Sequence, residues 1–244
     1  MPLKPHERIL VALDTFDHPM ALDLARRLAG RVGGVKVGLE LFTAAGPEIV
    51  REIRRTGIEV FLDLKLHDIP NTVAGAAAAA ARLGIAFLTV HALGGPAMIR
   101  CGVKASYEAA SEAGLPPPTV LAVTILTSQD DDGLRQIGLV GGCRSSVTRL
   151  AEIAREAGAG GIVCSPLEVA DVRGVFPSGT LVVPGIRPES GSGGRDDDQA
   201  RTATPGKAIR AGADRIVVGR PITGAADPLA AADAICGEIA AGSG

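Results

Sequence analysis

Eight short runs of apolar, mostly β-branched residues recur along this chain, separated by segments with the apolar spacing of amphipathic helices. Several of these segments begin near proline and end near glycine, as helices often do. The apolar runs predict strands over residues 8–13, 34–37, 58–64, 86–90, 119–124, 161–164, 180–183 and 215–218. The segments predict helices over residues 19–30, 46–56, 71–83, 96–113, 145–158, 166–173, 205–211 and 228–241.

Strand–helix alternation repeated eight times without a linker predicts an α/β fold, namely a (β/α)8 TIM barrel formed as a single domain over residues 1–244. A doubly wound open sheet is the alternative, but no GxGxxG pattern follows the first predicted strand. Hydrophobic residues make up 46% of the chain and aromatic residues only 2%. The core must therefore consist mainly of Ala, Val, Leu and Ile, which suit parallel strands covered on both faces.

Charge and cysteine content argue against several classes of protein. The formal net charge is −2, and neither basic runs nor aromatic stacking residues favour nucleic-acid binding. The alanine run 76–81 is too short to cross a bilayer, and residues 1–13 lack the apolar stretch of a signal peptide. The four scattered cysteines, which we interpret as small buried hydrophobes in a reducing compartment, are Cys101, Cys143, Cys164 and Cys236. We therefore expect a cytoplasmic protein without nucleic-acid or membrane partners.

The third predicted strand carries charged residues where a packed interior is expected. Side chains alternate along a strand, so Asp63 and Lys65 share one face and the neighbouring leucines share the other. If the leucines face the helices, the charged pair points into the barrel, near the C-terminal strand ends where barrel enzymes place their chemistry. A structural ion pair is the alternative interpretation, although burying it would carry a large desolvation cost.

Lysine is scarce, since only five of the 25 basic residues are lysines. Two of them, Lys36 and Lys65, lie within predicted strands. An ammonium group can give a proton to a reacting carbon, whereas a guanidinium effectively cannot. Lys36 by itself could also be a strand-end residue whose charged tip reaches solvent.

An anion site is predicted after the last two strands. Arg187 follows the seventh strand and Arg220 follows the eighth, and the loops at these places are the usual phosphate site of such barrels. Gly219 allows close approach of the backbone, and Arg220 can contact two phosphate oxygens. This pattern predicts a phosphorylated ligand without identifying a reaction.

The segment 189–203 is rich in Gly, Ser and Asp and predicts a long mobile loop beside the anion site, either a lid or an ordinary loop. Its aspartate triplet 196–198 is interpreted as solvated, and we expect no metal site. Gln199 is a candidate ligand contact. His67 and His91 lie near strand ends and are interpreted as structural, because no nucleophile pattern accompanies them.

The segment after the third strand resembles the signature of the orotidine 5′-monophosphate decarboxylase family. It reads Asp63-Leu64-Lys65-Leu66-His67-Asp68-Ile69-Pro70-Asn71-Thr72. Further landmarks of that family follow in order at residues 10–14, 35–38, 184–188 and 218–223, so the resemblance covers essentially the whole chain. The Asp-x-Lys-x-x-Asp core is shared with related sugar-phosphate enzymes, whereas its extension through residues 67–72 is much more specific.

The resemblance implies decarboxylation of orotidine 5′-monophosphate to UMP, the last step of de novo pyrimidine synthesis, in a homodimer with active sites at the subunit boundary. Lys65 would stabilise the carbanion at C6 of the pyrimidine and donate the proton, with Asp63 near the departing carboxylate. The implied charge chain consists of Lys36, Asp63, Lys65 and the neighbouring subunit's Asp68. The other implied contacts are Asp14 and Lys36 at the ribose, Thr127 at the pyrimidine, Arg187, Gln199, Gly219 and Arg220 at the phosphate, and Thr72 in the neighbour's site.

The chemistry of that reaction agrees with the residues. Loss of CO₂ leaves a localised carbanion without an ordinary electron sink, and the sequence contains no cofactor motif. We therefore expect no cofactor, and a fixed ammonium at Lys65 would provide electrostatic stabilisation instead. Two other functions are alternatives. The first is a Mg²⁺-dependent sugar-phosphate decarboxylase or aldolase that reuses the Asp-x-Lys-x-x-Asp strand around a metal, which Glu40 keeps possible. The second is a catalytically silent protein that binds a phosphorylated ligand.

Overall fold

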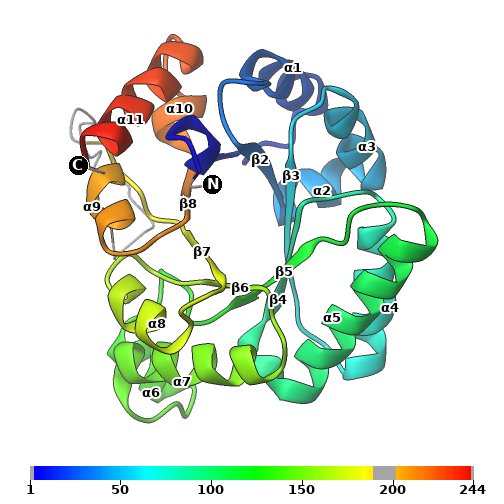
Figure 1. Ribbon diagram of the computed structural model, residues 1–244, viewed down its shortest axis with the longest axis vertical. Helices are drawn as coiled ribbons and strands as arrows, with labels where there is room; N and C mark the ends of the chain where they lie inside the picture. The colour runs from blue at the N-terminus through cyan, green and yellow to red at the C-terminus, as the bar shows by residue number, and fades with distance from the viewer. Residues whose placement is uncertain (1–2, 189–201, 243–244) are drawn as a thin grey trace.

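The computed structural model describes residues 3–188 and 202–242. Eight parallel strands close into a barrel in chain order, and Figure 1 shows them at the centre with the helices around them. The strands are β1 (Ile9–Ala12), β2 (Gly34–Gly38), β3 (Val60–Leu66), β4 (Phe87–His91), β5 (Thr119–Val123), β6 (Gly161–Val163), β7 (Thr180–Val183) and β8 (Arg215–Val218). The predicted (β/α)8 barrel is confirmed, and each predicted strand is present.

A helix lies between each pair of consecutive strands, as predicted, and another follows β8. These helices are α1 (His18–Leu28), α3 (Pro47–Arg55), α4 (Pro70–Ala81), α5 (Gly95–Glu112), α7 (Gly142–Glu156), α8 (Val169–Val175), α9 (Pro205–Arg210) and α11 (Pro228–Gly242). The sequence did not predict the short elements η1 (His6–Arg8), α2 (Leu39–Ala45), η2 (Ala92–Gly94), α6 (Asp131–Gln136) and α10 (Arg220–Thr223). All but η1 follow the C-terminal end of a strand, so they shape the face where the cavity described below opens.

Local chemistry explains where several helices begin and end. The Asp17 carboxylate accepts a hydrogen bond from the Met20 N–H at 3.0 Å and thereby caps the first turn of α1. Proline opens α3 and α4, where its missing N–H costs nothing. The chain then leaves α3 through Gly57, whose φ of +86° favours glycine.

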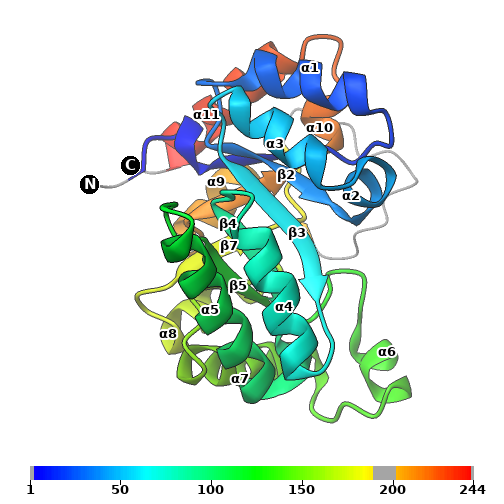
Figure 2. The ribbon, with the colours of Figure 1, turned by 90° about the vertical axis from the view of Figure 1, so that its right-hand side faces the viewer.

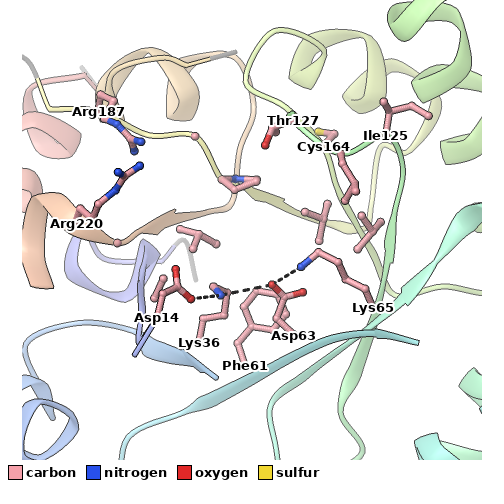
Figure 3. Close-up of a pocket in the computed structure, with 18 residues that line it drawn as sticks. Asp14, Lys36, Phe61, Asp63, Lys65, Ile125, Thr127, Cys164, Arg187 and Arg220 are labelled. Carbon is pink, nitrogen blue, oxygen red and sulfur yellow. Dashed lines mark hydrogen bonds and ion pairs between the residues drawn. The ribbon is translucent and has the colours of Figure 1, made fainter. Parts of the chain in front are cut away.

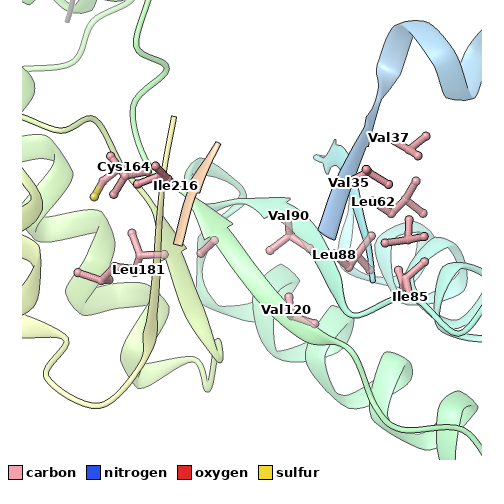
Figure 4. Packing of buried hydrophobic residues seen from close by; sticks show 14 of the residues in the cluster. Val35, Val37, Leu62, Ile85, Leu88, Val90, Val120, Cys164, Leu181 and Ile216 are labelled. Atoms are coloured by element: carbon pink, nitrogen blue, oxygen red, sulfur yellow. The ribbon is translucent and has the colours of Figure 1, made fainter. Parts of the chain in front are cut away.

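The main core lies between the strands and the surrounding helices. Val37, Leu62 and Leu88 occupy paired positions on β2, β3 and β4, and all three side chains are fully buried in this layer (Figure 4). The layer is almost entirely aliphatic, and Phe176 is its only buried aromatic residue among the described residues. This composition follows the low aromatic content of the sequence.

A second, smaller core fills the N-terminal half of the barrel interior. Its buried members are Leu10, Ala12, Phe61, Phe87, Leu121, Val182 and Val217. Phe61 and Phe87 pack edge to face with ring centroids 5.9 Å apart. The guanidinium carbon of Arg215 lies 5.0 Å from the Phe87 ring centroid. This half of the interior is therefore packed.

The two ends of the barrel differ in what surrounds them. In Figure 2 the arrowhead of β3 points toward the side where α6 lies, and both chain ends lie on the opposite side.

No helix among the described residues is long and apolar enough to cross a membrane. Cys143 and Cys164 are buried as expected, whereas Cys101 on α5 and Cys236 on α11 are only partly buried.

One strand departs from regular pairing. Leu62 pairs with Leu88, and the next pair is Leu66 with Val90, so four steps along β3 correspond to two along β4. The extra residues form a bulge that includes Lys65, whose φ is +49°. Lys65 is the only non-glycine residue with positive φ in the described ranges.

Candidate active site

A cavity of about 240 Å³ opens at the C-terminal end of the barrel. In the described part of the chain, its lining comes from every strand or the residues just after it, with the exception of β4. Figure 3 shows a row of charged side chains on one side, two arginines near one end and an apolar wall opposite. The cavity therefore combines a charged surface with an apolar one.

Most of the residues predicted for the site line this cavity. These are Asp14, Lys36, Asp63, Lys65, Thr127, Arg187, Gly219 and Arg220. Asp68 and Thr72 are not among the lining residues, and Gln199 lies outside the described residues together with positions 189–201 of the candidate lid. The barrel thus gathers residues from six strands that are up to about 200 positions apart in sequence.

Four side chains of alternating charge form a continuous row along the cavity (Figure 3). Lys36 Nζ lies 2.9 Å from Asp14 Oδ1 and 3.7 Å from Asp63 Oδ2, and Lys65 Nζ lies 2.7 Å from Asp63 Oδ2. A Cβ at Gly38 would lie 2.8 Å from Lys36 Nζ, so glycine at this position leaves room for the ammonium. Each buried charge in the row is thus paired, as burial requires.

Asp63 is the most buried member of the row, with a side chain only 10% exposed. Burial opposes its ionisation, but the ammonium groups of Lys65 and Lys36 and hydrogen bonds from Lys65 and Thr89 outweigh that effect. The net result holds the pKa of Asp63 below its usual value. Asp63 is therefore an anion that fixes the Lys65 ammonium.

Lys65 differs from its neighbours in both backbone and exposure. Its side chain is 32% exposed, compared with 12% for Lys36, so its ammonium is the more accessible from the cavity. Its left-handed backbone conformation is uncommon for a residue with a side chain. Such strain persists only where the surroundings hold it, and it occurs preferentially at functional sites.

Thr89 on β4 is a residue that sequence reasoning missed. Its hydroxyl accepts a hydrogen bond from the Lys65 N–H at 2.8 Å and donates one to Asp63 Oδ1 at 3.0 Å. The sequence gives no signal for this role, because a threonine in an apolar run is also a common strand former.

Arg187 and Arg220 lie at the other end of the cavity from Lys65, and Figure 3 shows their guanidinium groups pointing toward each other. The Arg187 backbone is fixed by a parallel bridge in which its N–H donates to the Ala203 carbonyl at 2.9 Å. Arg220 begins α10 directly after Gly219. Two planar cations in this arrangement suit a dianionic phosphate.

The apolar wall of the cavity was not predicted. It is formed by residues at or just after the C-terminal ends of β5, β6 and β7, namely Val123, Ile125, Val163, Cys164 and Pro184. Figure 3 places Ile125 and Cys164 on the side of Lys65 and Thr127. Such a wall lowers the local dielectric and strengthens the electrostatic interactions of the ammonium.

Asp68 and Thr72 are both exposed and belong to the segment between β3 and the first turn of α4. The Asp68 carboxylate accepts a hydrogen bond from the Ile69 N–H at 2.6 Å. Ile69 itself is 67% exposed. These residues therefore lie on the outer surface of the C-terminal face and not in the cavity of their own chain.

Two histidines stack at the rim beside the charged row. The ring centroids of His67 and His91 lie 5.2 Å apart with an angle of 23° between the planes. Burial, followed by the charges of His67 and Lys65, lowers the pKa of His91 to about 4. Neither ring lines the cavity, which agrees with a structural role.

Glu40 kept the metal-dependent alternative possible in the sequence. This residue is exposed on α2 and is not among the lining residues of the cavity. The described residues contain no group of three or more His, Cys, Asp or Glu side chains arranged to hold a metal ion. The lining carboxylates Asp14 and Asp63 are both engaged by lysines.

Comparison with known proteins agrees with the resemblance. Residues 7–235 match the family described as Orotidine 5'-phosphate decarboxylase / HUMPS. A protein of Anaeromyxobacter dehalogenans named orotidine 5'-phosphate decarboxylase is 56% identical over 234 residues, covering 96% of this chain and 98% of that protein. A protein of the same name from Paramagnetospirillum magneticum is 50% identical over 232 residues, covering 95% of this chain and 97% of its own length.

A solved structure gives the same result in three dimensions. The crystal structure of orotidine 5'-phosphate decarboxylase from Lactobacillus acidophilus matches with a TM-score of 0.81 at 42% identity. The match covers 95% of this chain and 98% of that one. The chain therefore belongs to the Orotidine 5'-phosphate decarboxylase / HUMPS family.

Proposed function

We propose that this chain converts orotidine 5′-monophosphate to UMP and CO₂, the last step of de novo pyrimidine synthesis, without a cofactor. The observation that carries the proposal is the row of alternating charges Asp14–Lys36–Asp63–Lys65 along the cavity, with two arginines near the opposite end. Family membership and the names of the close relatives support the same reaction.

The arrangement of the cavity suggests how the nucleotide binds. The phosphate contacts Arg187 and Arg220 and approaches the backbone at Gly219. The ribose hydroxyls contact Asp14 and Lys36, in the middle of the row. The pyrimidine then extends toward Thr127, the apolar wall and Lys65. Gln199 remains a proposed phosphate contact from the sequence pattern. Binding free energy gained at the phosphate can thus serve the chemical step at the other end of the substrate.

The chemical step breaks the bond between C6 of the pyrimidine and its carboxylate carbon. CO₂ leaves without the bonding electron pair, which stays on C6 as a carbanion. The Lys65 ammonium stabilises this charge and transfers a proton to C6, and solvent then reprotonates the resulting amine. Asp63 fixes Lys65 at 2.7 Å and lies beside the departing carboxylate. The electrostatic environment thus exists before the substrate binds, which avoids reorganisation during the reaction.

We further propose a homodimer in which Asp68 and Thr72 complete the cavity of the neighbouring subunit. Both residues are exposed at the C-terminal face, and the adjacent Ile69 presents an apolar side chain to solvent. Burial of Ile69 against a second copy would bring Asp68 of the partner subunit toward Lys65 and extend the alternating row of charges.

Mixed dimers test this arrangement. Lys65→Ala chains and Asp68→Ala chains are each expected to be inactive alone. A mixed dimer contains one site with both wild-type residues, so mixing should restore part of the turnover. A verified mixed dimer without recovered turnover would mean that each site is built from a single chain.

The reaction itself is tested by adding orotidine 5′-monophosphate to protein treated with EDTA and following the ultraviolet absorbance of the substrate. Full turnover in EDTA supports the proposal. Activity only after Mg²⁺ addition supports the metal-dependent alternative. Tight UMP binding without turnover supports a silent binding protein.

A cytoplasmic location is part of the proposal and is supported by the four free cysteines.

A further inference from the structure

Thr89 is a buried residue that contacts two members of the charged row, Asp63 and Lys65. It lies in the middle of β4, the strand that adds no residue to the described lining of the cavity, and its side chain is fully buried. Its hydroxyl bonds to Asp63, which lines the cavity, while Thr89 itself is not among the lining residues, so we expect no contact between Thr89 and a bound nucleotide. Any effect on the reaction must therefore pass through its neighbours.

The direction of both Thr89 hydrogen bonds is fixed by chemistry. An ionised carboxylate only accepts hydrogen bonds and a backbone N–H only donates them. The single hydroxyl proton must therefore go to Asp63 Oδ1 at 3.0 Å, and a lone pair must receive the Lys65 N–H at 2.8 Å. This one hydroxyl thus links the Asp63 carboxylate to the Lys65 main chain.

The link occurs at the point where β3 and β4 lose their regular pairing. Between Leu62 and Leu66 the register shifts, and Lys65 adopts its left-handed conformation there. The Lys65 N–H bonds to Thr89 Oγ1 instead of to a main-chain carbonyl of β4. The hydroxyl therefore supplies the partner that the bulge requires.

We infer that Thr89 is a positioning residue for the proton donor: its hydroxyl holds Asp63 and the Lys65 backbone together, so that the ammonium faces the cavity. The inference deepens the proposed decarboxylation and rests on it. Asp63 Oδ1 is held by Thr89 and Asp63 Oδ2 by Lys65 Nζ at 2.7 Å, so the carboxylate cannot rotate without breaking one contact. The strained Lys65 conformation is stabilised by the same group.

Thr124 is a matched control in the same barrel. It is equally buried, directly follows β5, and its hydroxyl donates to the Val163 carbonyl at 3.0 Å. Among the described residues its hydroxyl bonds to a main-chain carbonyl and not to the charged row, and Thr124 is not among the cavity-lining residues. Loss of this hydroxyl removes a buried hydrogen bond without disturbing the charged row.

The test compares Thr89→Val, which keeps the shape and removes the hydroxyl, with Thr89→Ser and Thr124→Val. Thr89→Val should lower kcat by about 100-fold, the scale of a small misplacement of a reacting group, while UMP affinity stays unchanged. Thr89→Ser should recover most of the turnover, and Thr124→Val should keep wild-type kcat. Wild-type kcat in folded Thr89→Val, or an equal loss of kcat in Thr124→Val, would overturn the inference.

A pH profile separates positioning from a loss of stability. Without the Thr89 hydrogen bond, the Asp63 carboxylate is less stabilised against the opposing effect of burial, although Lys65 and Lys36 still face it. The acid limb of log kcat should therefore move to higher pH in Thr89→Val and stay in place in Thr124→Val. An unmoved acid limb in Thr89→Val contradicts the inference.

Amide hydrogen exchange at Lys65, followed by NMR, is independent of turnover. Exchange should accelerate in Thr89→Val and not in Thr89→Ser or Thr124→Val. If the variants show this exchange pattern but the wild-type protein does not decarboxylate orotidine 5′-monophosphate, the proposed function is refuted and the positioning role of Thr89 still holds. Unchanged exchange in Thr89→Val refutes the positioning itself. If Thr89→Val does not fold, Thr89→Ala with the same exchange and pH measurements replaces it.

Discussion

The two halves of the barrel interior are built on the same strands but differ in chemistry. In the N-terminal half, Leu10, Phe61, Phe87 and Leu121 pack into a closed apolar cluster. In the C-terminal half, a row of alternating charges lines an open cavity. Along β3 the change from one half to the other occurs between Phe61 and Asp63.

The N-terminal half of the barrel interior therefore contributes mainly to stability, and the C-terminal half contributes mainly to chemistry. Burial of apolar side chains in the N-terminal half stabilises the barrel by about 1.5–3 kcal/mol per residue. Burial of charged groups is unfavourable unless each charge is paired, so the C-terminal half adds little stability. Substitutions in the N-terminal half should therefore lower the free energy of unfolding, whereas substitutions in the C-terminal half should lower turnover or ligand affinity.

The largest effect is expected for Lys65→Ala. If the ammonium stabilises the carbanion and protonates it, nearly all turnover disappears while the protein remains folded and still binds UMP. Lys65→Arg should also fail, because the wider guanidinium is a poor proton donor. Single-turnover measurements on folded protein provide the test, with the exposed Lys104→Ala as the control.

A purely structural Lys65 predicts the opposite result. Removing its nearest ion-pair partner would then leave the buried Asp63 with only the more distant Lys36 and lower the free energy of unfolding by up to about 3–5 kcal/mol. Folded Lys65→Ala molecules would retain near-normal turnover. That outcome would falsify the catalytic assignment and remove the functional distinction between the two halves of the barrel.

The second effect concerns the apolar half. Leu121 is fully buried, and a Cβ at Gly161 would lie 2.6 Å from its Cδ2, so the neighbouring glycine accommodates this leucine. Leu121→Ala should lower the free energy of unfolding by about 2–5 kcal/mol through loss of burial and a residual cavity. Turnover per folded molecule should remain near wild type.

Urea denaturation and active-site titration measure the two quantities separately. Leu121→Met conserves volume and should cost less than about 1.5 kcal/mol. A loss of turnover in folded Leu121→Ala without a loss of stability would show that the two halves are not separable.

The third effect concerns the phosphate end of the cavity. Arg220→Ala removes one of the two arginines and should weaken UMP binding by about 1.5–3 kcal/mol, the scale of a hydrogen bond to a charged group. Stability should hardly change, because Arg220 is exposed. Calorimetric titration with UMP provides the measurement. The control Arg82→Ala removes an exposed arginine that pairs with Glu112 on the outer helices. Unchanged UMP affinity in Arg220→Ala would remove the phosphate assignment.

The sequence predicted the regular parts of this structure because they obey one physical rule. Strands covered on both faces are continuous apolar runs, and eight such runs alternating with helices have few other solutions. The short helices α2, α6 and α10 were missed because helices of four to seven residues are too short to show an apolar period. Asp130 opens α6 by accepting a hydrogen bond from the Gly133 N–H at 2.8 Å.

The sequence predicted the charged residues of the site but not the residues that hold or surround them. Charged residues in apolar strands stand out, so Lys36, Asp63 and Lys65 could be identified from the sequence. The inward direction of Asp63 and Lys65 was expected from regular alternation, whereas in the structure the register shifts between Leu62 and Leu66 and Lys65 has a positive φ. Thr89 could not be identified, because its role depends on a contact between residues of different strands. The apolar wall was missed for the same reason.

The smallest effect concerns His91 at the rim of the charged half. Burial, with the charges of His67 and Lys65, depresses its pKa in the folded protein to about 4 from a usual value of 6.5. The His91 Nδ1 also accepts a hydrogen bond from the Leu93 N–H at 3.4 Å, which protonation would remove. Between pH 6.5 and 4 the unfolded chain therefore binds a proton that the folded chain does not.

The stability contributed by neutral His91 is complete above about pH 6.5 and is lost as the pH falls toward 4. The Asp63 carboxylate, whose pKa is also depressed, loses its contribution only below its usual value of 3.8, so the two effects occur in different pH ranges. Because His91 is partly exposed, solvent screening reduces the His91 effect to about 1–2 kcal/mol. Urea denaturation of His91→Asn at pH 7 and pH 4.5 should show a smaller decrease in stability than the wild type. His6→Asn, at the other end of the barrel, should retain the wild-type decrease, and an identical decrease in His91→Asn would show that the rim histidine is not held neutral by the fold.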